Sequence, residues 1–286
     1  MTESFVFALT RYLYIKEDVL MTLLISILEK DYDQCLFWAS ELYFSGYEKE
    51  TIEYIYSIYS ELFYSNNPRL KRIMETALKR YDKGIHIAAS MLLNLTSKMR
   101  IFTLNDFIAK NKEPEEISNA KEKETKIMIF SDILEANKYN NFVQQTKYRF
   151  ILKEACKYQV KREWVDVFEC AYRDMNSNEV YKTITSNWLY YASYSPIWKE
   201  RIEQHHGIID EKNEKIYFEN DDWFEKFHEL YEYELDEQDK DVQSKIFGSS
   251  ILKKFNMNDL YKKYEPGIKI KKIKLKRVND KCSKSK

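Results

Sequence analysis

Apolar side chains recur at helical spacing through most of the first hundred residues. A helix places residues i, i+3, i+4 and i+7 on one face, and five segments follow this rule. They are Lys16–Glu29, Asp31–Gly46, Lys49–Ser65, Pro68–Tyr81 and Ile85–Lys98. Because connections of roughly two to four residues join them, consecutive helices must pack as antiparallel neighbours. The pattern predicts an antiparallel helical bundle or a short α-solenoid, without the fixed period of a named repeat.

The segment Asp31–Gly46 is apolar on most of its faces. One stripe holds Cys35, Leu36, Ala39, Leu42 and Tyr43. Phe37 and Trp38 lie outside that stripe. A helix that is apolar nearly all round must be covered on more than one side, so we expect this helix in the middle of the array. Asp31 is the expected N-cap, and Gly46 the expected end. If Phe37 and Trp38 stay exposed, they form a partner surface instead.

Helical spacing resumes after a charged stretch that interrupts the chain. Residues 109–126 hold Pro114 and a single large apolar residue, Ile117, which is typical of a linker or loop. The helices expected beyond it are Lys126–Asn137, Asn141–Lys161, Arg162–Arg173, Asn178–Tyr194, one from Pro196 to Gly207, one from Asp221 or Asp222 to Glu234, and Asn258–Tyr264. We therefore expect a helical bundle in residues 1–108, a linker in 109–126, a second helical region in 127–265 and a basic tail in 266–286.

One segment reads as β-structure. Residues 208–220 contain two short apolar runs on either side of a polar turn at Glu211–Glu214, which predicts a β-hairpin. The chain has only five glycines and four prolines, far fewer than an all-β fold with many tight turns needs. The expected fold class is therefore all-α with one small hairpin.

Charge is balanced overall but not along the chain. The 46 basic and 46 acidic residues cancel, so net charge predicts no polyanionic partner. The tail is the exception, and its candidate nucleic-acid contacts are Lys269, Lys271, Lys272, Lys274, Lys276 and Arg277. Two other interpretations stay open. The tail is a solubilising end, or the Ile/Lys alternation of Ile268–Ile270 and Ile273–Leu275 marks an edge strand or a partner-docking segment.

Motifs for known chemistry are missing from the sequence. There is no glycine loop for phosphates, and no HExxH, CxxC or GxSxG. The stretch Asp210–Asp221 resembles a calcium loop, but Lys215 stands where that loop needs glycine. The four cysteines have no close pair, which indicates reduced thiols. The sequence therefore predicts no catalytic residue, no cofactor and no metal site.

Residues with possible chemistry have a structural interpretation as well. Cys156 and Cys170 fall on apolar helix faces, where packing explains them. His205-His206 falls at a helix C-terminus, where the helix dipole favours an imidazolium. The aromatic residues between Trp188 and Trp198 either stack a planar ligand or pack two helices at a corner. We favour the structural interpretation for each.

The longest apolar stretch is too short for a membrane. Val19–Leu28 has about ten residues, half of what a bilayer-spanning helix needs. We therefore expect no membrane association and an intracellular, cytoplasmic protein.

Two resemblances bear on the setting. Asp31–Gly46 (DYDQCLFWASELYFSG), the Tyr-rich helix after it and the segment Glu237–Tyr264 resemble uncharacterised helical proteins of large nucleocytoplasmic DNA viruses. This resemblance implies a viral protein in the host cytoplasm or the virion and no known activity. The helix Asp31–Gly46 also resembles the helical collar of AAA+ clamp-loader-type proteins. The nucleotide-binding domain of that family is absent, so this resemblance implies no ATPase.

Three functions follow, in order of preference. The first is a non-enzymatic helical scaffold that binds a protein partner or a second copy. The second is an accessory factor that binds nucleic acid through the tail, and loses this binding on truncation after Pro266. The third is an enzyme of unfamiliar type, which requires a pocket with several perturbed ionisable groups.

Overall fold

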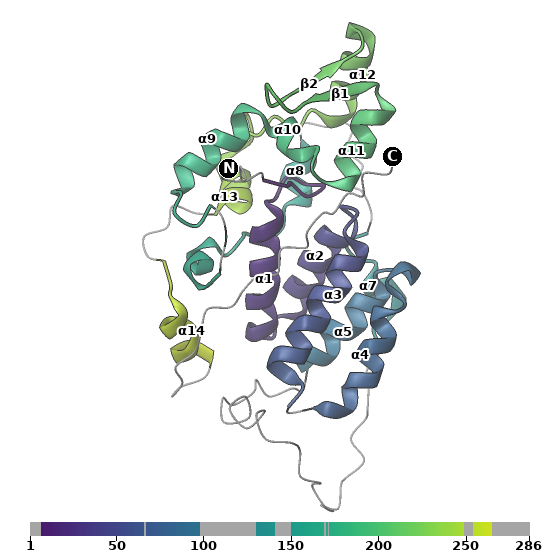
Figure 1. The fold of residues 1–286 in the computed structure, drawn as a ribbon, viewed down its shortest axis with the longest axis vertical. Coiled ribbons are helices and arrows are strands. Elements are labelled where there is room, and N and C mark those ends of the chain that lie inside the picture. The colour runs from purple at the N-terminus through teal and green to yellow at the C-terminus, as the bar shows by residue number, and fades with distance from the viewer. Residues whose placement is uncertain are drawn as a thin grey trace, which may run out of the picture.

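The computed structural model describes residues 7–65, 67–97, 130–140, 150–168, 170, 172–248 and 254–264. Over these ranges the chain is mostly helical and has a single antiparallel hairpin (Figure 1). The predicted all-α fold with a small hairpin is therefore confirmed. The predicted linker 109–126 and basic tail 266–286 lie outside the described residues. Within the part of the chain that is described, no helix is both long and apolar enough to cross a bilayer.

The first half forms the predicted array of antiparallel helices. Its elements are α1 (Lys16–Glu29), α2 (Tyr32–Tyr43), α3 (Glu48–Ile58) with a π-helical continuation (Tyr59–Phe63), a 3-10 turn (Pro68–Leu70), α4 (Lys71–Leu78), a second 3-10 turn (Tyr81–Lys83) and α5 (His86–Ser97). Helix α2 packs against α1, α3 and α5, as its all-round apolar surface predicts. The Asp31 carboxylate caps it by accepting from the Gln34 N–H at 3.0 Å.

The residues before α1 form a buried turn rather than a helix. Leu9 and Ile15 pair as an isolated β-bridge, and Leu13 between them has a φ of 66°. The Tyr14 N–H donates to the Thr10 hydroxyl, and the Thr10 N–H donates to the Tyr14 carbonyl at 2.8 Å. We call residues 9–15 the N-terminal turn. Side chains from distant parts of the chain also bind this turn, since the Arg11 N–H donates to the Ser45 hydroxyl at 2.8 Å and the Tyr12 N–H donates to the Glu41 carboxylate at 3.0 Å.

The second half is less regular than its apolar spacing predicts. Its elements are α7 (Ile133–Ala136), α8 (Ile151–Ala155), a 3-10 helix (Arg162–Val167), α9 (Ser177–Ser186), α10 (Trp188–Ala192), α11 (Pro196–Gln204), β1 (Gly207–Asp210), β2 (Lys215–Phe218), α12 (Asp221–Tyr231), α13 (Lys240–Phe247) and α14 (Met257–Tyr264). The predicted helix Asn178–Tyr194 breaks at Asn187, whose φ of −146° and ψ of 44° are not helical. Helix α13 was not predicted.

Tertiary hydrogen bonds explain why the chain is not helical after α8, although the sequence predicts a helix over Asn141–Lys161. The Val160 N–H donates to the Lys245 carbonyl at 3.1 Å, and the Lys161 N–H donates to the Thr22 hydroxyl at 2.9 Å. These partners lie far away in the sequence and replace the bonds that a helix would make. The prediction of a continuous helix is therefore wrong over its last six residues.

Buried residues from both halves belong to one hydrophobic core. The turn after α2 meets the start of α11, where the Ile197 N–H donates to the Ser45 carbonyl at 3.2 Å. Gly46 makes this approach possible, because a Cβ there would lie 2.5 Å from the Pro196 Cβ. The other side of α1 contacts the 3-10 helix Arg162–Val167. The boundary predicted at 109–126 thus separates two stretches of sequence that share a core.

Candidate functional site

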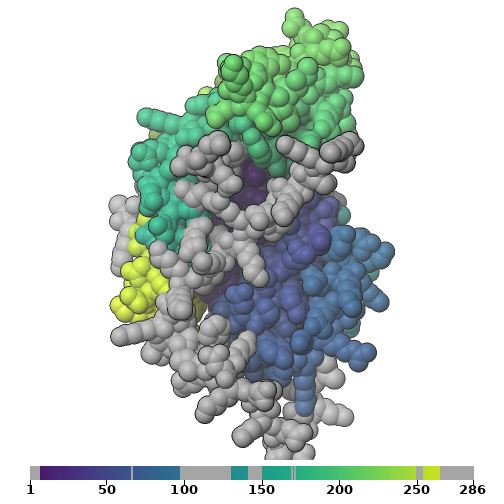
Figure 2. All heavy atoms as spheres, in the orientation of Figure 1, coloured from purple at the N-terminus to yellow at the C-terminus, as the bar shows by residue number. Residues whose placement is uncertain are grey.

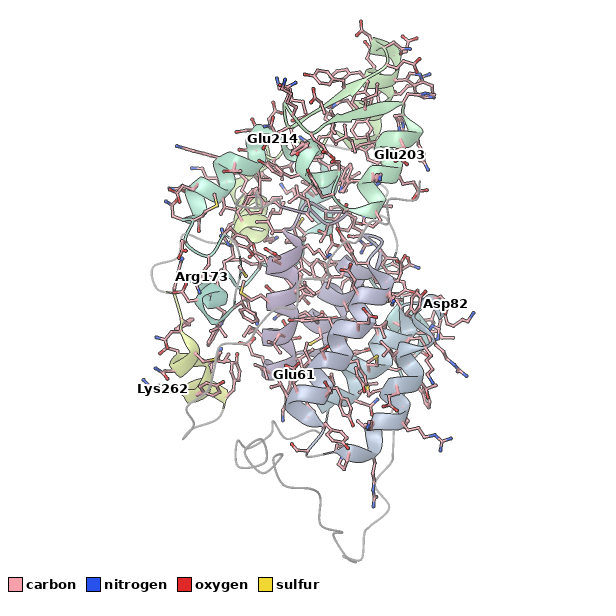
Figure 3. The ribbon with its side chains drawn as sticks, in the orientation of Figure 1. Glu61, Asp82, Arg173, Glu203, Glu214 and Lys262 are labelled. Carbon is pink, nitrogen blue, oxygen red and sulfur yellow. The ribbon has the colours of Figure 1, made fainter. Side chains whose placement is uncertain are left out.

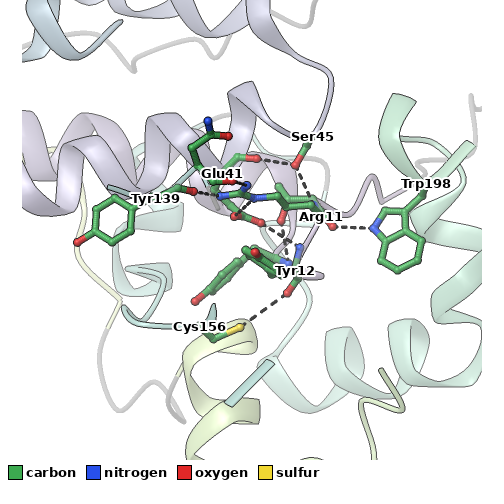
Figure 4. Close-up of polar contacts among 10 residues, drawn as sticks. Arg11, Tyr12, Glu41, Ser45, Tyr139, Cys156 and Trp198 are labelled. Carbon is green, nitrogen blue, oxygen red and sulfur yellow. Dashed lines mark hydrogen bonds and ion pairs between the residues drawn. The ribbon is translucent and has the colours of Figure 1, made fainter. Parts of the chain in front are cut away.

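A buried ion pair joins the N-terminal turn to α2. Arg11 Nε lies 3.1 Å from Glu41 Oε2, and both side chains are buried. The Tyr12 N–H donates to Glu41 Oε1 at 3.0 Å, and Arg11 Nη2 donates to the Tyr139 carbonyl at 2.7 Å (Figure 4). The charges are therefore matched and surrounded by hydrogen bonds, which makes this network a structural link between distant segments.

The aromatic residues near Trp198 complete that link. Trp198 is fully buried and its Nε1–H donates to the Thr10 carbonyl at 2.9 Å. Its ring lies edge-on to Trp188 and Tyr233, with centroids 5.5 and 5.4 Å away. The guanidinium of Arg201 lies 4.5 Å above the Trp198 ring. This geometry agrees with the helix-packing interpretation of the aromatic cluster.

A second buried charge cluster joins α1 to the second half. The Tyr172 hydroxyl donates to Asp18 Oδ1 at 2.6 Å, and Arg162 Nε lies 3.5 Å from Asp18 Oδ2. Burial raises the pKa of Asp18, although Arg162 and the Tyr172 hydrogen bond both act to lower it. Asp18 and Arg162 are almost wholly inaccessible to solvent, so this cluster links α1 to the second half inside the fold.

The described cysteines and histidines have structural surroundings. Cys35, Cys156 and Cys170 are buried, and burial raises the pKa of the Cys170 thiol to about 12. Thiols with raised pKa are poor nucleophiles, in line with the packing interpretation of Cys156 and Cys170. His205 Nδ1 lies 2.8 Å from the Arg201 carbonyl at the end of α11. Among the residues that the structure describes, no three His, Cys, Asp or Glu side chains are arranged to hold a metal ion.

The predicted partner surface on α2 is corrected by the structure. Phe37 and Trp38 are 2% and 0% exposed. The rings of Tyr139 and Tyr158 lie 5.2 Å from the Phe37 ring, and the Tyr14 ring lies 5.0 Å from the Trp38 ring. Neither residue is available to a partner, because segments far away in the sequence cover them. The tail residues Lys269, Lys271, Lys272, Lys274, Lys276 and Arg277 lie outside the described residues.

The hairpin has one covered face and one open face. Residues Gly207–Asp210 pair with Lys215–Phe218, with Ile208 opposite Tyr217 and Ile209 opposite Ile216. Successive side chains of a strand point to opposite faces. Ile209, Ile216 and Phe218 face inward, and the Phe218 ring lies 4.9 Å from Phe227 of α12. Ile208 and Tyr217 point outward and are 62% and 49% exposed. We call the face formed by this pair the outer hairpin face.

Local sequence sets the shape of the hairpin. The Asp210 carboxylate accepts from the N–H groups of Lys212 and Asn213 at 3.0 and 3.1 Å, which fixes the turn. Glu214 then adopts a φ of 53°. At the other end, Gly207 lets β1 pass close to α11, since a Cβ there would lie 2.4 Å from Ile202 Cγ2. The hairpin is thereby fixed to α11 and stands out from the body with α12 (Figure 2).

The hairpin and α12 are strongly acidic. Gly207–Tyr231 contains eight carboxylates and three lysines. The carboxylates are Asp210, Glu211, Glu214, Glu219, Asp221, Asp222, Glu225 and Glu229. All but Asp210 are exposed. We call Gly207–Tyr231 the acidic module. It combines an exposed apolar pair with a net excess of five carboxylates, and it is the candidate functional site of the described chain.

Sequence reasoning located the hairpin but not its open face. Both strands have consecutive apolar residues, Ile208-Ile209 and Ile216-Tyr217-Phe218. A strand that is apolar on both faces is expected to be covered on both. The two apolar faces of the strands are therefore the sequence feature that points to the site. They identify the open face only once the structure shows that α12 covers the other face of the hairpin.

We expect His228 to make the stability of the acidic module depend on pH. Burial lowers its pKa, against the opposing effect of the Glu232 carboxylate. Its ring lies 4.2 Å from Phe224, and Nδ1 lies 3.8 Å from Glu234 Oε1. The unfolded chain binds a proton near pH 6.5, but the folded chain binds it only at lower pH, so stability falls as pH falls below about 6.5. When the pH is lowered from about 7 to 5.5, we expect the melting temperature of His228→Phe to fall by about 1–3 °C less than that of the wild type. An equal loss in both proteins would contradict this assignment.

Comparison with protein-family models, with curated proteins and with solved structures finds no match to this chain. The interpretation of the site therefore rests on its own geometry.

Proposed function

We propose that the chain is a non-enzymatic interaction protein that binds a protein partner through the outer hairpin face. The helices of the first half and the core they share with the second half serve as the scaffold. The resemblance to helical proteins of large DNA viruses adds a viral setting, in the host cytoplasm or the virion, to this proposal.

The observation that carries the proposal is the exposed Ile208–Tyr217 pair on a fixed, protruding hairpin. The two buried charge clusters support the proposal, because their charged groups pair inside the fold. Arg11 pairs with Glu41, and Arg162 pairs with Asp18. An exposed apolar pair on a module rich in exposed charged residues resembles the apolar centre and polar rim of protein interfaces. Tyrosine is also enriched among the residues that contribute most to binding.

The test is a pair of surface variants. Ile208→Ser with Tyr217→Ser removes the outer hairpin face, and Ile133→Ser with Leu134→Ser removes an exposed apolar pair elsewhere. We expect both variants to keep the helical circular dichroism of the wild type. In quantitative pull-downs from the native cell, only the hairpin variant loses partners that the wild type recovers. Equal recovery of those partners by both variants would contradict the proposal.

A second candidate function is nucleic-acid binding through the basic tail. One feature of the described structure supports it: the last turn of α14 carries Lys262 (Figure 3) and also Lys263, shortly before the tail in the sequence. Titration of DNA and RNA with the full chain and with a chain truncated after Pro266 tests it. Salt-sensitive binding that disappears on truncation supports this candidate, and equal binding by both chains opposes it.

A further inference from the structure

We propose that the outer hairpin face binds the basic tail, residues 266–286, of a second copy of this chain. This inference rests on the proposed function and names the partner. The chain would then carry both halves of its own interface, with the acidic module of one copy on the tail of the next.

Charge complementarity is the first argument. The acidic module has eight carboxylates against three lysines, and the tail has nine basic residues against the single acid Asp280. The acidic module therefore has a net charge of −5 and the tail a net charge of +8, although the whole chain is neutral. Segments of opposite sign attract each other before contact and favour one register after it.

The alternation of apolar and basic residues in the tail is the second argument. Ile273–Lys276 alternates isoleucine or leucine with lysine over four residues, which is the length of β2. Among the described residues the sheet has two strands, so one edge of each strand lacks a strand partner there, and an extended peptide can add to such an edge. An added strand places its alternate side chains on one face of the sheet. Ile273 and Leu275 would extend the apolar face that Ile208 and Tyr217 begin, with the lysines left for the surrounding carboxylates.

The position of α14 favours a tail from a second copy. The Tyr264 hydroxyl donates to Glu29 Oε1 at 3.0 Å, so the C-terminal end of α14 lies at the C-terminal end of α1. The acidic module joins the fold through α11, whose Trp198 binds Thr10 before the other end of α1. Helix α1 has 14 residues and is about 21 Å long.

The reach of the tail favours a second copy. Ile273 follows Tyr264 by nine residues, which span at most about 32 Å when fully extended, and α1 alone accounts for about 21 Å of the separation. Only a nearly fully extended tail reaches the hairpin of its own copy, so we assign the contact to a second copy. Figure 1 shows α14 and the hairpin toward opposite ends of the molecule. A contact of this kind closes as a two-fold dimer when two copies exchange tails, and it builds rings or open chains when the copies follow one another head to tail.

A charge-swap experiment on the full chain tests the inference. Glu211→Lys, Glu219→Lys and Glu225→Lys change the net charge of the acidic module from −5 to +1, and Lys271→Glu, Lys272→Glu and Lys274→Glu lower the net charge of the tail from +8 to +2. Light scattering of the wild type at low salt should show self-association that weakens toward about 0.5 M salt. Each variant alone should self-associate about tenfold more weakly or worse, and an equal mixture of the two should recover a complex. Circular dichroism of each variant checks that the fold is retained.

The outcomes separate this inference from the proposed function. If the wild type stays monomeric at every protein and salt concentration, the inference is overturned. This holds whether the tail binds nucleic acid or the hairpin of its own copy. Self-association that survives Ile208→Ser with Tyr217→Ser also overturns it. If that same variant loses its cellular partners while self-association is unchanged, the proposed function stands and the inference fails. If each variant alone is monomeric and only their mixture forms a complex, the result supports both the inference and the proposed function.

Discussion

Glu41→Ala is expected to lower the free energy of unfolding by about 3–5 kcal/mol. The substitution leaves the Arg11 guanidinium buried without its carboxylate, and it removes the acceptor of the Tyr12 N–H. The N-terminal turn also carries the Thr10 carbonyl that binds Trp198, so its loosening reaches α11 as well. Chemical denaturation followed by circular dichroism measures the change.

Two further variants show whether the pairing itself is responsible. Glu53→Ala removes an exposed carboxylate that lies 3.6 Å from Lys49, and exposed pairs of this kind contribute about 0.5 kcal/mol or less. Arg11→Met combined with Glu41→Leu removes both buried charges and should cost less than Glu41→Ala alone. If the double variant is the less stable one, the loss comes from packing and hydrogen bonds rather than from an unpaired charge.

Sequence reasoning predicted the first half well because its helices carry their information locally. Helix α2 is apolar on nearly every face, and the structure covers it with α1, α3 and α5. Asp31 caps it as expected. The same local reasoning placed the hairpin, since two apolar runs flank the Asp210 turn.

Local patterns could not predict the segments that distant partners stabilise. The stretch after α8 has helical spacing, but its N–H groups bond to Lys245 and Thr22 instead. The buried charged residues also bind partners that are distant in the sequence. Arg11 and Glu41 are 30 residues apart, and Asp18 and Tyr172 are 154 apart, so no spacing brings either pair together.

The burial of Phe37 and Trp38 and the exposure of Ile208 and Tyr217 share one physical cause. All four are apolar residues on elements whose apolar surface is wider than a single contact face requires. Which of them is covered depends on what packs there, and that is a tertiary property. Residues 139 and 158 return to cover α2, whereas α12 covers only one face of the hairpin. The sequence therefore narrows the candidate sites to several apolar surfaces, but it does not show which of these surfaces stays exposed.

Arg162→Met is expected to cost about 3–5 kcal/mol near neutral pH, because it leaves the Asp18 carboxylate buried without a cation. The loss should depend on pH in a definite direction. Burial already raises the pKa of Asp18, and removing Arg162 takes away the charge that acts to lower it. Above about pH 4 the unfolded chain has released this proton while the folded variant still binds it.

Stability of Arg162→Met should therefore fall as pH rises above about 4, by at most about 1.4 kcal/mol per pH unit, until the folded carboxyl ionises. The wild type should show a shallower fall, since Arg162 stabilises the ionised form. Adding Asp18→Asn to Arg162→Met removes the titrating group and should flatten the profile, although the Tyr172 hydroxyl keeps a neutral acceptor. Denaturation at several pH values measures all three profiles. Parallel profiles for Arg162→Met and the double variant would mean that Asp18 is not the group that senses the loss of Arg162.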